Sequence, residues 1–158
     1  MEYYDGIAQG YNELYGEEQR SKARTVQKIL CIGPDETVLD VGCGTGLATL
    51  ELGGKKTGVE PARVLSKQAS FPVVHARAEQ LPFKDKSFDV VVCLTAIHHC
   101  DANKALLEMK RVARQKIAVS VLKKAKNFGA IVAAMRAAFG NVDEQEMEKD
   151  VLFTAKLK

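Results

Sequence analysis

Three glycines, Gly42, Gly44 and Gly46, alternate with other residues directly after the apolar run 37–41, and Asp40 lies inside that run. Glycine suits positions where the backbone takes a positive φ or where a Cβ would collide with a ligand. The dinucleotide fingerprint is GxGxxG, and the spacing here differs from it. A carboxylate at Asp40 would repel a pyrophosphate and attract an ammonium group. The segment therefore predicts a loop for a ligand that carries a positive charge and no obvious phosphate.

A second acidic residue, Glu60, ends the next β-branched run, 18 residues after Gly42. An acid at that place can accept hydrogen bonds from both hydroxyls of a ribose. Together with the glycine loop it predicts a nucleoside ligand with a cationic appendage, a description that S-adenosylmethionine fits.

Two adjacent histidines, His98 and His99, follow the apolar run 88–94 and are candidate general bases, because imidazole titrates near neutrality. A structural role in capping the next helix or packing under the nucleoside is the alternative. Asp101 is most simply the N-cap of that helix. Adjacent residues rarely converge on one metal ion, so we expect no metal site. Cys100 could also act as a nucleophile, but nothing in the sequence indicates the lowered thiol pKa that this role needs.

Basic residues dominate residues 104–136, which hold nine Lys or Arg and the single acid Glu108. A solvated helix face is one interpretation, and an anionic substrate or partner is the other. Lys123, Lys124 and Lys126 follow a predicted strand and would emerge at the same sheet end as the glycine loop. We favour a small anionic acceptor over RNA, because RNA binding also needs aromatic stacking and this stretch offers only Phe128.

The elements that must position these residues alternate between two periodicities. Short β-branched runs predict strands at 37–41, 56–60, 72–76, 88–94 and 116–122. Helical patterns at 102–114 and 128–139 lie between or after them, the second apolar nearly all round and expected to be buried. This alternation predicts a three-layer α/β/α, Rossmann-like open sheet that is mostly parallel.

The two ends of the chain flank that sheet. Residues 1–33 are expected to form a helical cover in two segments, near 7–15 and 21–31, and residues 37–158 the α/β core of a single domain. The run 151–158 alternates apolar and polar residues and suits a final edge strand, antiparallel to its neighbour. The acidic stretch before it is expected to be a loop.

Composition agrees with one globular domain: the 158 residues are 46% hydrophobic and 27% charged. No run approaches 18 apolar residues, and the start shows no signal-peptide pattern, so we expect a cytoplasmic protein without a membrane span. The four cysteines have no CxxC spacing and are expected to be reduced.

The chain resembles the class I S-adenosylmethionine-dependent methyltransferases, in the broad group that includes the ubiquinone and menaquinone C-methylases. The resemblance rests on VLDVGCGTG at 38–46, GVEP at 58–61, ARAEQLPFKDKSFDVVVCLTAIHHC at 76–100 and ALLEMKRVAR at 105–114. With YYDGIAQGYNELY near the start, these motifs cover most of residues 3–114, and four motifs in the right order are far more specific than one glycine loop.

The resemblance implies roles for individual residues. It assigns the cofactor's methionine amino group to Asp40, its methionine and adenosine to Gly42, Cys43, Gly44 and Gly46, its ribose hydroxyls to Glu60, its adenine to Pro61, Ala78 and Glu79, and its methionyl chain to Leu94 and Thr95. Tyr4 or Tyr11 would close over the sulfonium, where an aromatic face favours a cation. One departure is Arg77, where the family often has an aspartate that accepts from adenine.

The family fold has seven strands, whereas the patterns above give six, so we expect a core shortened at its C-terminal end. An open acceptor pocket follows, which suits a macromolecule, a partner subunit or a second copy of the chain in a homodimer. The leading interpretation is a methyltransferase that acts on a small anionic acceptor or RNA. The alternative is a non-catalytic, cofactor-binding subunit that stabilises or activates a partner. The glycine spacing and Asp40 disfavour a nicotinamide-dependent dehydrogenase.

Overall fold

A computed structural model describes residues 8–158, with side chains from residue 16 onward. These residues form one seven-stranded sheet in the order β3-β2-β1-β4-β5-β7-β6. The strands are β1 (Thr37–Val41), β2 (Lys55–Val59), β3 (Val73–Val74), β4 (Phe88–Leu94), β5 (Ala113–Leu122), β6 (Asp143–Glu146) and β7 (Asp150–Lys156). The first five run parallel, whereas β7 and β6 pair antiparallel. The predicted, mostly parallel α/β sheet is thus confirmed.

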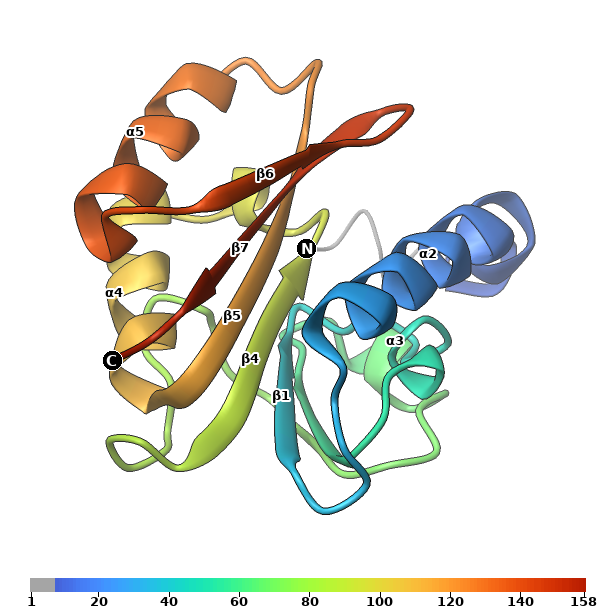
Figure 1. Cartoon of the computed structure of the whole chain (residues 1–158). Helices are drawn as coiled ribbons and strands as arrows, with labels where there is room; N and C mark the ends of the chain where they lie inside the picture. Colours follow the sequence, from blue (N-terminus) through green and yellow to red (C-terminus); the bar gives the residue numbers. More distant parts are fainter. Residues whose placement is uncertain (1–7) are drawn as a thin grey trace.

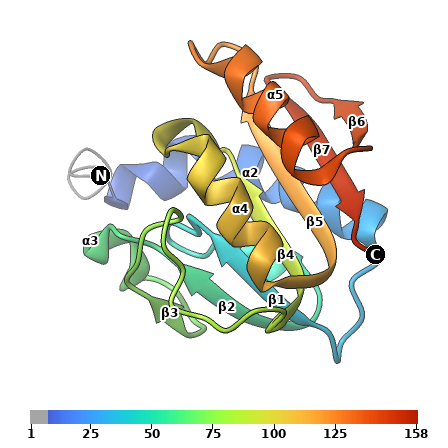
Figure 2. The same ribbon diagram turned by 90° about the vertical axis from the view of Figure 1, so that its left-hand side faces the viewer.

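Helices cover both faces of the sheet. The elements are α2 (Ala8–Leu30), η1 (Thr49–Glu51), α3 (Arg63–Ser66), η2 (Ile97–His99), α4 (Ala102–Val112) and α5 (Phe128–Phe139). Helix α2 lies on one face, and α4 and α5 lie on the other (Figures 1 and 2). In residues 8–158 no helix is both long enough and apolar enough to cross a membrane.

Strand β4 shows how the sheet divides the core between its two faces. Val90, Val92 and Leu94 pack in the cluster beneath α2, whereas Val91 and Cys93 pack in the cluster beneath α4 and α5. Successive side chains of a strand point to opposite faces, and both faces here are covered. A strand buried on both faces reads as a continuous apolar run, and the predicted bounds 88–94 match β4.

Helix α2 is continuous, so the expectation of two separate segments is wrong. Residues 16–20 join the two expected segments, although polar residues interrupt the apolar pattern there. Gly16 lies within the helix and is buried, and a Cβ on it would come within 3.2 Å of Leu47 Cδ2. The close approach of α2 to the loop after β1 explains a glycine in the middle of a helix.

The connections after β1 and β2 are shorter than expected. Where parallel strands are usually joined by a helix, only turns and the single 3-10 turn η1 occupy residues 42–54. The next connection contains α3, one turn long, and β3 has two residues where five were predicted. The reduced elements therefore lie in these two connections and not, as expected, at the C-terminal end, where both β6 and β7 are present.

The sheet has seven strands rather than the predicted six, because the acidic stretch forms β6 and not a loop. All four β6 residues are exposed, so no apolar alternation marks the strand in the sequence. β6 takes the edge position, and β7 lies inside the sheet between β5 and β6. The prediction that 151–158 is an edge strand is therefore corrected, while its antiparallel direction is confirmed. Helix α5 matches its predicted bounds, but its Ala130, Ala133 and Arg136 side is exposed.

Candidate functional site

The glycine loop begins where β1 ends. Gly42, Gly44 and Gly46 have φ values of 76°, 59° and 80°, which residues other than glycine rarely adopt. The backbone N–H groups of Gly42 and Cys43 donate to the Val59 carbonyl at 2.7 and 3.1 Å, which fixes the loop to the end of β2. A Cβ on Gly42 would lie 2.6 Å from Ala96 Cβ, so the loop packs directly on the segment after β4.

Glu60 is held at the end of β2 by backbone donors. Its Oε1 accepts from the Gly44 N–H at 2.9 Å and its Oε2 from the Ala62 N–H at 2.8 Å, and the residue is only 2% exposed. These two backbone donors hold the carboxylate in one orientation at the end of β2.

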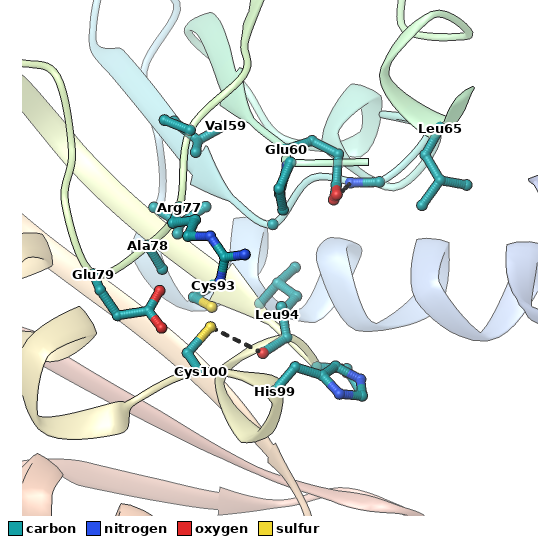
Figure 3. A pocket seen from close by; sticks show the side chains of 17 residues that line it. Val59, Glu60, Leu65, Arg77, Ala78, Glu79, Cys93, Leu94, His99 and Cys100 are labelled. Atoms are coloured by element: carbon teal, nitrogen blue, oxygen red, sulfur yellow. Dashed lines mark hydrogen bonds between the residues drawn. The ribbon is translucent and has the colours of Figure 1, made fainter. Parts of the chain in front are cut away.

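A pocket opens at the carboxyl ends of β1, β2 and β4, with Glu60 on one side and His99 on the other (Figure 3). The predicted residues that line it are Gly42, Gly44, Glu60, Pro61, Ala78, Glu79, Leu94, Thr95 and His99. Those that the sequence analysis did not assign to the cofactor are Val41, Val59, Leu65, Ala76, Arg77, Cys93, Ala96 and Cys100. Most of the second group are the sequence neighbours of the first, so adjacency was the available signal. Leu65 comes from α3, and no feature of the sequence pointed to it.

Asp40 and Cys43 line a smaller adjoining pocket that shares Gly42 and Leu94 with the first and is closed by Gly16 and Gln19 of α2. The Asp40 carboxylate accepts a hydrogen bond from Thr49 Oγ1 at 2.7 Å. Burial, helped by the nearby Glu60 charge and opposed by that hydrogen bond, raises the pKa of Asp40 to about 7. A buried carboxylate of this kind gains from a cationic partner.

Three other predicted cofactor residues remain: one lies outside both pockets, and the structure does not describe the side chains of the other two. Gly46 packs against Phe71, whose Cε1 would lie 2.7 Å from an added Cβ, and lines neither pocket. Tyr4 lies outside the described residues, and so does the side chain of Tyr11.

The histidines lie in η2, with ring centroids 4.0 Å apart. Burial lowers the pKa of both His98 and His99, so both rings are neutral and able to accept a proton at neutral pH. His99 lines the main pocket, whereas His98 does not.

Two neighbours of the histidines have structural contacts. Cys100 Sγ donates to the Ala96 carbonyl at 3.6 Å, and burial raises the pKa of Cys100 to about 11, which disfavours it as a nucleophile. Asp101 caps α4 by accepting from the Lys104 N–H, as predicted.

Most of the basic residues in 104–136 bond to the protein itself. Lys110 donates to the Ala138 carbonyl, and ion pairs join Arg111 to Glu108 and Asp85, Arg114 to Asp89, Lys116 to Glu36, Lys123 to Glu146 and Arg136 to Glu144. Lys124 and Lys126 are exposed between β5 and α5. Of the three predicted substrate lysines, Lys123 pairs with Glu146 of β6, and none lines the main pocket.

The cysteines and acids of the described residues suggest no metal site. Cys31, Cys43, Cys93 and Cys100 are all free thiols. No group of three or more His, Cys, Asp or Glu side chains with a metal-binding arrangement occurs in the part of the chain that the structure describes.

Comparison with known proteins assigns a family to this geometry. The methyltransferase domain model matches residues 39–119. A protein of Methanocaldococcus jannaschii is 38% identical over 119 residues, which are 72% of this chain and 47% of that protein. A demethylmenaquinone methyltransferase of Mycolicibacterium paratuberculosis is 32% identical over 70% of this chain and 53% of its own. The chain thus spans about half the length of these relatives.

Solved structures share the fold over its whole length. An S-adenosylmethionine-dependent methyltransferase of Thermotoga maritima superposes with a TM-score of 0.77 at 21% identity, covering 100% of both chains. A chain in the complex between the Haloferax volcanii Trm112 methyltransferase activator and a methyltransferase gives 0.80 at 15% identity, covering 97% of this chain and 96% of that one.

Proposed function

The chain is a member of the methyltransferase domain family, and we propose that it transfers a methyl group from S-adenosylmethionine to a small acceptor molecule. S-adenosylmethionine is the cofactor on which these methyltransferases depend. The observation that supports the proposal best is the buried Glu60 carboxylate, which two backbone N–H groups aim at the pocket beside the glycine loop.

The residues present fit this cofactor. Glu60 presents a carboxylate, the acceptor type that ribose hydroxyls require, on the wall of the main pocket, and the buried Asp40 carboxylate suits an ammonium group. Val59, Leu65 and Ala78 offer an apolar surface for a purine. Arg77 stands where the family often has an acid and lines the same pocket (Figure 3). A guanidinium cannot accept from adenine, but its plane can stack on an aromatic ring.

The chemistry requires mostly alignment from this chain. The cofactor supplies an electrophilic methyl group, and an in-line displacement gains its rate from proximity and orientation. Glu60 would hold the ribose of the cofactor and Asp40 its amino group, so that the two carboxylates would orient the methyl group between fixed points. His99, neutral at the edge of the pocket, is the candidate base for an acceptor that arrives protonated.

For the acceptor we propose a small anion, supported by the exposed Lys124 and Lys126 at the same end of the sheet. The double variant Lys124→Ala/Lys126→Ala should raise KM for an anionic acceptor, once a panel screened by S-adenosylhomocysteine release has found one. Lys123→Ala is the matched control, because its ammonium already pairs with Glu146 at 2.8 Å. An unchanged KM in the double variant would rule out this part of the proposal.

The first test is calorimetric titration of the purified chain with S-adenosylmethionine and S-adenosylhomocysteine, with NAD as control. We expect micromolar binding of both sulfur ligands and none of NAD. Absence of binding would refute the cofactor site in the isolated chain. Binding without turnover on any acceptor would favour the alternative of a non-catalytic subunit. Repeating the turnover assay with candidate activator proteins then tests a dependence on a partner, the kind of complex in which the Haloferax neighbour was solved.

A further inference from the structure

Thr95 adopts an unusual backbone conformation at the wall of the main pocket. Its φ is 55°, in the left-handed region, where a β-branched residue is a genuine outlier. Such a residue persists only where its surroundings hold it in place, and strained residues cluster at functional sites. Thr95 directly follows β4, and its neighbours Leu94 and Ala96 line the same pocket.

Three elements hold Thr95 in this conformation. The Thr95 N–H donates to Ser120 Oγ at 2.8 Å and to the Ser120 carbonyl at 3.3 Å, both in β5. Thr95 Oγ1 donates to Asp150 Oδ2 at 2.9 Å, at the start of β7, and accepts from Lys22 Nζ in α2. Lys22, Ser120 and Asp150 form the clamp around Thr95.

Two members of the clamp form a buried ion pair. Lys22 Nζ lies 3.0 Å from Asp150 Oδ2, and the two side chains are 4% and 1% exposed. A buried ion pair is weak evidence for stability, because well-packed apolar residues often replace it at no loss. Here both charges also contact Thr95, a hydrogen-bonding role that apolar side chains would not fill.

The clamp reaches the glycine loop through a short chain of contacts. Ala96 follows Thr95, and its Cβ would lie 2.6 Å from a Cβ placed on Gly42. A change in the Thr95 backbone would therefore be passed to Ala96, which packs on the loop that carries the Gly44 N–H, a donor to Glu60. Helix α2 thus contacts the pocket residue Thr95 through Lys22, and its described residues do not line the main pocket.

We propose that Lys22 and Asp150 are positioning residues of the cofactor pocket, which act by holding Thr95 in the left-handed conformation. The proposal rests on the cofactor site proposed above. A purely structural tether is the rival explanation, and the other end of α2 offers one for comparison. Lys116 Nζ donates there to the Leu30 carbonyl at 2.9 Å and pairs with Glu36, far from the pocket.

The test compares Lys22→Met/Asp150→Leu, which removes both charges and leaves neither unpaired, with Lys116→Met. Calorimetry with S-adenosylhomocysteine is run where urea titration shows every variant fully folded. We expect the double variant to bind about tenfold more weakly, by analogy with the loss of one positioned contact, and Lys116→Met to bind within about twofold of wild type.

Variants of Thr95 separate its hydroxyl from its shape. Thr95→Val keeps the branched side chain but loses Oγ1, and should weaken binding as the double variant does. Thr95→Ser keeps the hydroxyl and should lose less affinity than Thr95→Val does. Thr95→Val added to Lys22→Met/Asp150→Leu should bring no further loss, because residues that act through one contact are not additive.

Hydrogen exchange of the Thr95 amide, measured without ligand, keeps this inference separable from the proposed function. The double variant should speed exchange at Thr95 and Ala96, while Lys116→Met leaves it unchanged. If the folded double variant exchanges and binds like wild type, or if Lys116→Met matches its losses, the clamp is only a tether. A different result is also informative: wild type binds no cofactor, and the Thr95 amide is protected in wild type and in Lys116→Met but not in the double variant. In that case the cofactor site is refuted and the clamp is supported.

Discussion

The two halves of the sheet are built differently. In the first half, β1, β2 and β3 are joined by single turns, η1 and α3, and Leu65 of α3 packs in a small cluster with Ala62 alone. In the second half, α4 and α5 are full helices whose buried residues join the largest core cluster. The first half supplies the carboxylates and backbone donors of the pocket, and the second supplies most of the apolar burial. Binding and stability therefore depend largely on different residues.

Truncation of equally buried leucines in the two halves tests this division most strongly. Leu106→Ala in α4 should lower the free energy of unfolding by about 2–5 kcal/mol, because it leaves a cavity in the main core. Leu65→Ala should lower it by less, because its site borders an open pocket into which water can enter. Urea unfolding measures both.

A control for that pair lies next to Leu106. Leu107 is 60% exposed, so Leu107→Ala should change the unfolding free energy by no more than about 0.5 kcal/mol. Equal losses for Leu65→Ala and Leu106→Ala would remove the distinction between the halves.

Glu60→Ala should change cofactor affinity more than it changes the free energy of unfolding. Losing hydrogen bonds to ribose hydroxyls should weaken S-adenosylhomocysteine binding by about ten- to a hundredfold, or about 1–3 kcal/mol. Glu60→Gln keeps one carbonyl acceptor and should fall between Ala and wild type. Calorimetry at one temperature decides the order, and unchanged affinity in Glu60→Ala would remove Glu60 from the site.

Asp40 should make cofactor binding depend on pH. Because the pKa of Asp40 is about 7 in the ligand-free protein, most molecules carry it protonated at about pH 6. Only the carboxylate pairs with an ammonium group, and the ligand's own amino group stays protonated in this range. Affinity should therefore rise with pH between about 5.5 and 7, approaching tenfold per unit at the acid end.

The matched variant for this effect is Asp40→Asn, which keeps the shape but cannot titrate. Its affinity for S-adenosylhomocysteine should be low and independent of pH over the same range. A wild-type titration that is equally flat would contradict the assignment of Asp40 to the ammonium group.

The smallest expected effect concerns the cap of α4. Asp101→Ala removes the acceptor of the Lys104 N–H and should lower the unfolding free energy by about 1 kcal/mol, with unchanged cofactor affinity. Asp101→Asn retains a cap and should recover most of the loss. A change in affinity larger than the change in stability would link α4 to the pocket after all.

Prediction from the sequence succeeded where one local pattern had one physical cause. Strands β1 and β4 are buried on both faces, and their continuous apolar runs gave their bounds correctly. Strand β6 could not be found this way, because its exposed side chains leave no alternation and only its backbone pairs with β7. Helix α2 was predicted as two segments because polar residues interrupt its apolar pattern, although the helical backbone continues through them.

The sequence by itself determined the existence of the five parallel strands, the glycine loop and the acid at the end of β2, because each of these rests on residues close together in the chain. Only the tertiary structure decided which side chains surround Thr95 and which basic residues are already paired. Lys22 and Asp150 are 128 positions apart, and Lys123 meets Glu146 across the β6–β7 hairpin. Such pairs leave no local pattern, since their partners meet only when distant segments of the chain pack together, α2 against the start of β7 for the buried pair and the end of β5 near β6 for the exposed one.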